Sequence, residues 1–98
     1  MKDLSTCREE INRIDDEMKK LFIERMEIVA DVAKYKKENN LPIFDAKREA
    51  SMKDRLSSDL DILKPYYLNF LEVMLKESKE YQKEMLGIKW NGFIWELV

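Results

Sequence analysis

The chain has 98 residues, 45% of them hydrophobic and 39% charged, and a formal net charge of −2 at pH 7. This length supports one domain, and the slight acidity disfavours a general nucleic-acid binder, whose phosphate partners attract a basic excess. No apolar run approaches the ~18 residues of a membrane span. The chain has no histidine and one cysteine, Cys7, which excludes a Ser-His or Cys-His mechanism, a histidine-based metal site and a disulfide within the chain.

The first residues and the single cysteine also bear on location. Met1-Lys2-Asp3-Leu4 does not resemble the start of a signal peptide, and one cysteine fits a reducing compartment. We therefore expect a cytoplasmic protein with no membrane or nucleic-acid partner and no metal.

A long first helix is expected over residues 4–39, because no Gly or Pro occurs before Pro42. Asp3 or Ser5 is a candidate N-cap, and Asn39-Asn40 a candidate end. At about 1.5 Å per residue this helix is about 54 Å long, whereas a compact chain of this size has a radius of gyration of only ~13 Å. Pairing with a second copy would cover the helix, so a homodimer is expected.

Cationic residues interrupt the apolar seam of this helix. The seam recurs at spacings of three and four, at Leu4, Cys7, Ile11, Ile14, Met18, Leu21, Ile28, Val32 and Tyr35. Arg25 occupies the middle of the seam, and Lys36 lies on the same side of the helix. Both long side chains are also explained without a function, by reaching to the surface or by pairing across a coiled coil, and Arg25 taken alone does not decide between a functional and a structural role.

A short second helix follows a connector. Leu41-Pro42-Ile43-Phe44 is expected to be non-helical, because a proline disfavours helix at the residue before it. Asp45 is a good N-cap for a helix to about Ser57. One face of this helix is charged at its start and apolar at its end, through Asp45, Arg48, Glu49, Met52 and Leu56. The simplest interpretation of the charged part is a cap and a solvated first turn.

A third helix of medium length is expected from Pro65, which suits a first turn, to about Leu86, where Gly87 can close it. Ser78 and Gln82 interrupt its apolar stripe. A buried polar group without a partner costs about 1–3 kcal/mol, so both side chains need partners. A hydrogen bond to the neighbouring backbone explains them as well as a ligand does.

All three helices thus place polar or charged groups on faces that should pack. The set comprises Arg25, Lys36, Arg48 and Gln82 as donors, Glu49 as an acceptor, and Ser78 as either. Such a pocket suits a small, multiply anionic, oxygen-rich ligand. Without histidine, a metal-ligand set or a Gly-rich phosphate loop, the remaining catalytic option is electrostatic stabilisation of the ligand's own rearrangement.

Three segments in this order resemble the all-helical chorismate mutases. The first helix of that family is similar to Arg8-x2-Ile11-x2-Ile14-Asp15, Glu24-Arg25 and Val32-x3-Lys36. Its loop and second helix are similar to Pro42-x2-Asp45-x2-Arg48-Glu49, and the end of its third helix to Ser78-x3-Gln82. The resemblance covers about residues 4–86, and no family active-site position is replaced.

The resemblance implies an all-α fold of three helices per chain, intertwined as a homodimeric bundle with two equivalent sites. It also implies the [3,3] rearrangement of chorismate to prephenate, in the shikimate pathway to phenylalanine and tyrosine, with no cofactor. Residues 1–87 would form the helical domain, and the apolar tail 88–98 lies outside the family pattern.

Roles at the carboxylates follow from the same resemblance. Arg25 would bind one substrate carboxylate, Ser78 would contact a carboxylate, and Arg8 of the partner subunit would help to bind the anionic groups. The helix geometry supports this sharing, because Arg8 and Arg25 of one chain are seventeen positions apart, ~25 Å along a helix.

The remaining implied roles concern the reacting ether and the ring. Lys36 and Gln82 would donate to the ether oxygen, where negative charge grows as the carbon–oxygen bond breaks. Glu49, assisted by nearby Asp45 and Arg48, would hold the ring hydroxyl.

Two other functions stay open. An isochorismate-pyruvate lyase shares this fold and much of this site, whereas a non-catalytic helical adaptor or regulator does not need polar residues in its packing stripes. The tail 88–98 carries an Asn91-Gly92 hairpin signal. It is expected either to pack on the helices or end in disorder, or to serve as a docking segment for a partner enzyme or a cover for the site.

Overall fold

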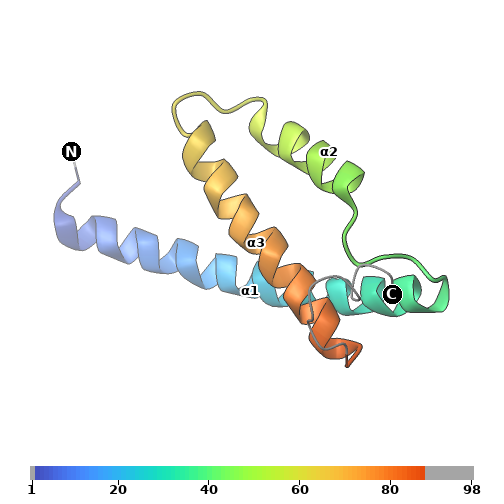
Figure 1. Cartoon of the computed structure of the whole chain (residues 1–98). Coiled ribbons are helices and arrows are strands. Elements are labelled where there is room, and N and C mark those ends of the chain that lie inside the picture. Colours follow the sequence, from blue (N-terminus) through green and yellow to red (C-terminus); the bar gives the residue numbers. More distant parts are fainter. Residues whose placement is uncertain (1, 88–98) are drawn as a thin grey trace.

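The computed structural model describes residues 2–87, which form three α-helices and no strand (Figure 1). The helices are α1 (Leu4–Glu38), α2 (Ala46–Ser57) and α3 (Lys64–Met85). α3 crosses α1 and also packs against α2. The expected all-α class, with a long, a short and a medium helix, is confirmed. The tail 88–98 lies outside the described residues.

The helix ends have local causes. Asp3, rather than Ser5, caps α1, its carboxylate accepting a hydrogen bond from a backbone N–H of the first turn at 2.8 Å. Asn40 follows α1 with a φ of 56°, a left-handed conformation that asparagine tolerates and that stops the helix. Asp45 caps α2 by accepting from the backbone N–H of Arg48 at 2.9 Å.

The core lies mainly between α2 and α3. Its most buried members are Met52, Leu71 and Leu75, with Leu56, Tyr67 and Met74 packed against them. From the C-terminal half of α1, Val29 and Ala33 are buried, and Ile43 of the connector is 2% exposed. This packing holds the C-terminal half of α1, the connector and the first turn of α2 around one end of α3.

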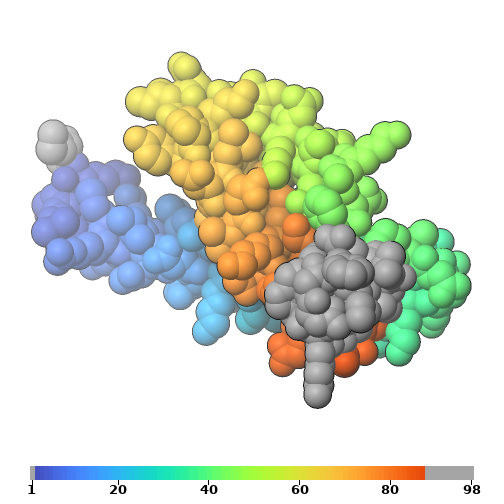
Figure 2. All heavy atoms as spheres, in the orientation of Figure 1, coloured from blue at the N-terminus to red at the C-terminus, as the bar shows by residue number. Residues whose placement is uncertain are grey.

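The N-terminal half of α1 projects away from this core (Figures 1 and 2). The described part of the chain measures 54 × 25 × 22 Å and has a radius of gyration of 16.8 Å, against ~13 Å for a compact domain of this size. The seam on this half is exposed at Leu4, Ile11, Ile14, Met18 and Leu21. One chain therefore leaves uncovered the surface that the expected homodimer would bury. None of the described helices has the length and apolar content needed to cross a bilayer.

Candidate active site

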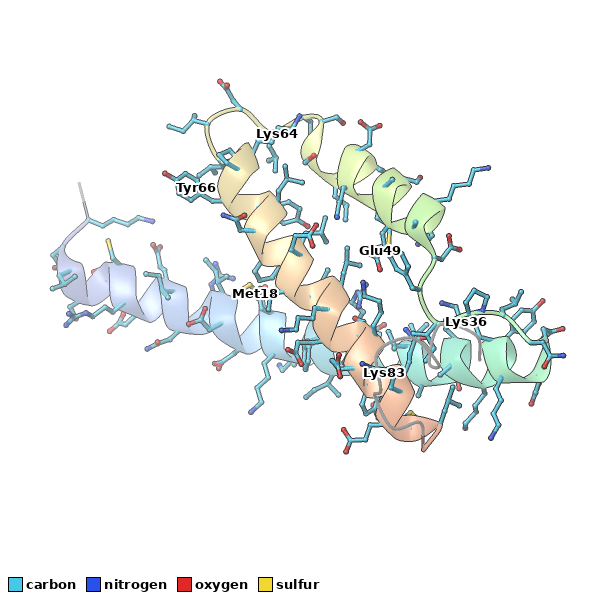
Figure 3. All side chains as sticks on the ribbon, in the orientation of Figure 1. Met18, Lys36, Glu49, Lys64, Tyr66 and Lys83 are labelled. Carbon is cyan, nitrogen blue, oxygen red and sulfur yellow. The ribbon has the colours of Figure 1, made fainter. Side chains whose placement is uncertain are left out.

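A cavity of about 280 Å³ lies where the three helices meet. It is lined by seven of the eight predicted site residues: Arg25, Lys36, Asp45, Arg48, Glu49, Ser78 and Gln82. Its walls are otherwise largely apolar, with Ile28, Val29, Val32, Met52 and Leu75. Figure 3 shows Lys36 on the C-terminal part of α1 and Glu49 at the start of α2. The structure thus gathers residues up to 57 positions apart into one small site.

Arg25 and Ser78 form one polar end of the cavity. Nη1 of Arg25 donates to Oγ of Ser78 at 2.5 Å, and this hydroxyl donates to the backbone carbonyl of Met74 at 2.8 Å. Ser78 is 5% exposed, so these two bonds satisfy its buried hydroxyl. The same bonds orient the guanidinium, which has five N–H donors and uses one of them here. The backbone bond expected of Ser78 is therefore present, and its contact with a ligand stays a prediction.

Lys36 approaches the cavity from the end of α1. Its ammonium donates to the backbone carbonyl of Ile43 at 2.6 Å, which ties the connector to the helix. Burial lowers the pKa of Lys36, while the nearby carboxylates of Asp45 and Glu49 partly offset this by raising it, and the positive charge of Lys79 lowers it further. An ammonium has three donors, so Lys36 can keep its bond to Ile43 and still donate to a ligand.

Gln82 contributes an amide from α3. It is 6% exposed, and its amide oxygen is buried with no hydrogen-bond partner among the described residues. A buried amide without a partner is unfavourable by about 1–3 kcal/mol. This oxygen can only accept, so a ligand hydroxyl in the cavity would satisfy it, and the N–H groups of the same amide are the donors available to a ligand oxygen.

The start of α2 supplies the acidic part of the site. Glu49 forms an ion pair with Lys79 of α3, 2.9 Å from Nζ to Oε2. Asp45 and Arg48 line the cavity but are exposed, and the carboxylate of Asp45 is also the N-cap of α2. Among residues 2–87, no three or more His, Cys, Asp or Glu side chains gather in a way that could hold a metal ion.

Lys79 and the carbonyl of Ile43 also contribute to the site, and neither was predicted from the sequence. Lys79 lies four positions after Leu75 and three before Gln82, a spacing that already places it on the cavity side of α3. This spacing could have identified Lys79 from the sequence. No sequence pattern indicates where the carbonyl of Ile43 points, because its direction depends on the path of the connector.

Arg8 is the predicted site residue that one chain does not bring to the cavity. It is exposed on the projecting half of α1 and does not line the pocket. Its assignment to the site of a partner subunit stays a prediction.

The fold and the cavity define a small all-helical domain whose cavity is lined by cations, carboxylates and an amide, groups that suit an anionic, oxygen-rich ligand. The sequence profile of the chorismate mutase type II family matches residues 7–83, which is most of the chain. The chain belongs to this family. The resemblance seen in the sequence is thereby confirmed.

Curated relatives agree with this assignment. The chain is 34% identical over 82 residues to a bifunctional chorismate mutase/prephenate dehydratase of Buchnera aphidicola subsp. Acyrthosiphon pisum, covering 81% of this chain and 21% of that protein. It is 29% identical over 86 residues to a chorismate mutase of Methanocaldococcus jannaschii, covering 85% and 87% of the two chains. The chain spans only about a fifth of the length of the bifunctional relatives. No solved structure gave a significant match.

Proposed function

We propose that this protein is a chorismate mutase, which rearranges chorismate to prephenate in the route to phenylalanine and tyrosine. The observation that carries the proposal is the convergence of Arg25, Lys36, Glu49 and Gln82, from three helices, on one cavity. The names of the relatives support the same activity. A non-catalytic adaptor would not need a buried amide oxygen that lacks a partner.

The reaction is intramolecular. One carbon–oxygen bond of the enolpyruvyl ether breaks while one carbon–carbon bond forms, and no proton changes place. The protein therefore has two tasks, to hold the compact chair-like conformer and to stabilise the polarised transition state. The chemistry calls for positioned donors rather than a titrating acid or base.

The residues divide these tasks by position. Arg25, oriented by Ser78, binds a carboxylate of the substrate dianion. Lys36 and Gln82 donate to the ether oxygen, which gains negative charge as its bond to the ring breaks. Glu49 accepts a hydrogen bond from the ring hydroxyl. Because these groups are fixed before the substrate arrives, little reorganisation is needed during the reaction.

The working form is a homodimer in this proposal, and Arg8 of the partner subunit completes each site. The exposed seam of α1 and the extended shape support the dimer. The single cysteine favours the cytosol. The names of the bifunctional relatives fit an association with an enzyme that consumes prephenate. Docking of such an enzyme is one of the roles open to the tail 88–98, beside packing on the helices and covering the site.

Incubation of the purified protein with chorismate tests the function. Loss of the ultraviolet absorbance of chorismate with appearance of prephenate is expected from the parent and not from Arg25→Ala. Release of pyruvate from isochorismate would identify the lyase instead. Absence of any turnover would favour the adaptor.

A further inference from the structure

Lys79 is a charged residue of the cavity that none of the roles above explains. Its ammonium lies 2.9 Å from Oε2 of Glu49 and 4.7 Å from the centroid of the Phe44 ring. The side chains of the ion pair are only 22% and 15% exposed. Lys79 thus links α3 to the first turn of α2 and to the connector before it.

The charges around Glu49 explain why such a link matters. The charged groups of the cavity are Asp45, Glu49, Arg25, Lys36, Arg48 and Lys79, and Lys53 of α2 also lies close enough to Glu49 to interact electrostatically. Among the described residues, Lys79 is the ion-pair partner of Glu49. Lys36 and Lys53 act on Glu49 electrostatically without pairing with it. Without its ion pair the carboxylate is therefore less fully compensated and weakens the binding of a dianion, the more so where water is partly excluded.

We infer that Lys79 is a positioning residue, which neutralises Glu49 and fixes its carboxylate so that the cavity admits a dianionic ligand. Oε2 binds Lys79, and Oε1 stays available to accept a hydrogen bond from a ligand hydroxyl. The inference rests on the proposed function for the identity of that ligand.

The geometry favours this indirect role over direct contact with the substrate. The ammonium of Lys79 has the carboxylate of Glu49 on one side and the face of the Phe44 ring on another, and both contacts stabilise a cation in that place. Moving the ammonium to a substrate carboxylate would give up both contacts and leave the partly buried Glu49 without its ion-pair partner. Lys79 therefore acts through Glu49.

Three variants and a control separate this role from a merely structural one. Lys79→Met removes the charge and keeps most of the length, Lys79→Arg keeps the charge, and Lys79→Met with Glu49→Gln removes both charges. Lys76→Met is the control, because Lys76 is exposed on the same helix and does not line the cavity. The readouts are kcat and KM for chorismate, the Kd for prephenate by calorimetry, and the melting temperature.

Lys79→Met should raise KM and the prephenate Kd about ten- to hundredfold, with a smaller effect on kcat, because the uncompensated carboxylate repels both dianions. Lys79→Arg should restore most of the binding. The double variant should bind prephenate more tightly than Lys79→Met alone, because its cavity no longer holds an uncompensated carboxylate. Lys79→Gln replaces Lys79→Met if the methionine variant does not fold.

Equal prephenate binding by the double variant and by Lys79→Met would overturn the inference, as would a Lys79→Met protein that behaves like the Lys76→Met control. A parent protein that binds prephenate but does not convert chorismate would overturn the proposed function, while the order of the Kd values still decides the role of Lys79. A parent that does neither overturns both.

Discussion

The surroundings of Lys36 fix the position of its ammonium and lower its pKa. The bond from its ammonium to the carbonyl of Ile43 fixes where the positive charge lies. Burial is the largest cause acting on its pKa and lowers it below the ordinary value of 10.5, against the opposing effect of Asp45 and Glu49. Lys36 therefore gives up its proton at a lower pH than a solvated lysine does.

Lys36→Ala should reduce kcat by about 10²–10³, the usual cost of losing a donor aimed at developing charge. The helical circular dichroism should stay unchanged, because the substitution removes no apolar core residue. Lys37→Ala, at an exposed neighbouring position outside the cavity lining, is the control and should keep full activity. Near-normal kcat in Lys36→Ala would remove Lys36 from the mechanism.

The pH profile follows from Gln82 being an amide, which donates at every pH. With no histidine in the chain, kcat/KM should be nearly flat from about pH 6 to 8. Activity should then decline on the alkaline side as Lys36 is deprotonated, since its lowered pKa brings this limb below that of an ordinary lysine. Steady-state kinetics from about pH 6 into the alkaline range measure both the flat part and the alkaline decline.

Gln82→Glu tests whether the pH-independent donation by the Gln82 amide causes the flat profile. A carboxyl group can donate to the ether oxygen only when protonated, so the activity of this variant should fall as pH rises. A steep limb between about pH 6 and 8 in the parent would instead reveal a titrating group in the reaction.

Three of the predicted site residues share one property, which is a polar or cationic side chain at a position where an apolar one belongs. Arg25, Ser78 and Gln82 stand out in this way and all line the cavity. The spacing of Lys79 from Leu75 and Gln82 places it on the cavity side of α3, but its ion pair with Glu49 is not contained in that spacing. Such a pairing across two helices depends on tertiary packing, which the local pattern does not contain.

Among the secondary-structure elements, the three helix ranges were predictable for local reasons. Asp3 caps the start of α1 and Asn40 follows its end, Asp45 caps the start of α2, and Pro65 and Gly87 lie at the two ends of α3, so most of the boundaries have a cap or a breaker in the sequence. The crossing of α3 over α1 was not predictable in this way, because it results from the packing of side chains between helices.

Asp45 caps the N-terminus of α2, and this capping does not require its negative charge. Asparagine caps as well as aspartate does, so Asp45→Asn should keep the stability of the protein and most of its kcat/KM. Asp45→Ala should lower the free energy of unfolding by about 1 kcal/mol and loosen the turn that carries Glu49, with a larger loss of activity. Urea unfolding and kinetics measure the two effects. Equal stability of Asp45→Ala and the parent would argue against the cap.

At the scale of the whole molecule, one chain leaves half of its longest helix without tertiary packing. Leu4 and Leu21 are 63% and 64% exposed, near the two ends of this projecting segment. Apolar surface of this extent is characteristic of an interface with another chain. Arg8 lies on the same segment, so a partner that covers the seam is also placed to receive its guanidinium.

Mixed dimers test the sharing of sites. Arg8→Ala and Arg25→Ala chains should each be inactive alone, because each lacks a cation in every site. Heterodimers formed by refolding them together have one site that lacks both cations and one intact site, so part of the activity should return. Recovery is measured with a differently tagged copy of each chain, and its absence in confirmed heterodimers would contradict a shared site.

The central claim is that this cavity rearranges chorismate without moving a proton. Proton NMR of chorismate incubated with the parent protein in D2O tests it most directly. The expected product is prephenate, without pyruvate and without deuterium on its ring carbons, and Arg25→Ala should give no acceleration. Deuterium on a ring carbon, release of pyruvate, or equal conversion by Arg25→Ala would contradict the claim, whereas the methylene beside the keto group exchanges with D2O by itself and is not counted.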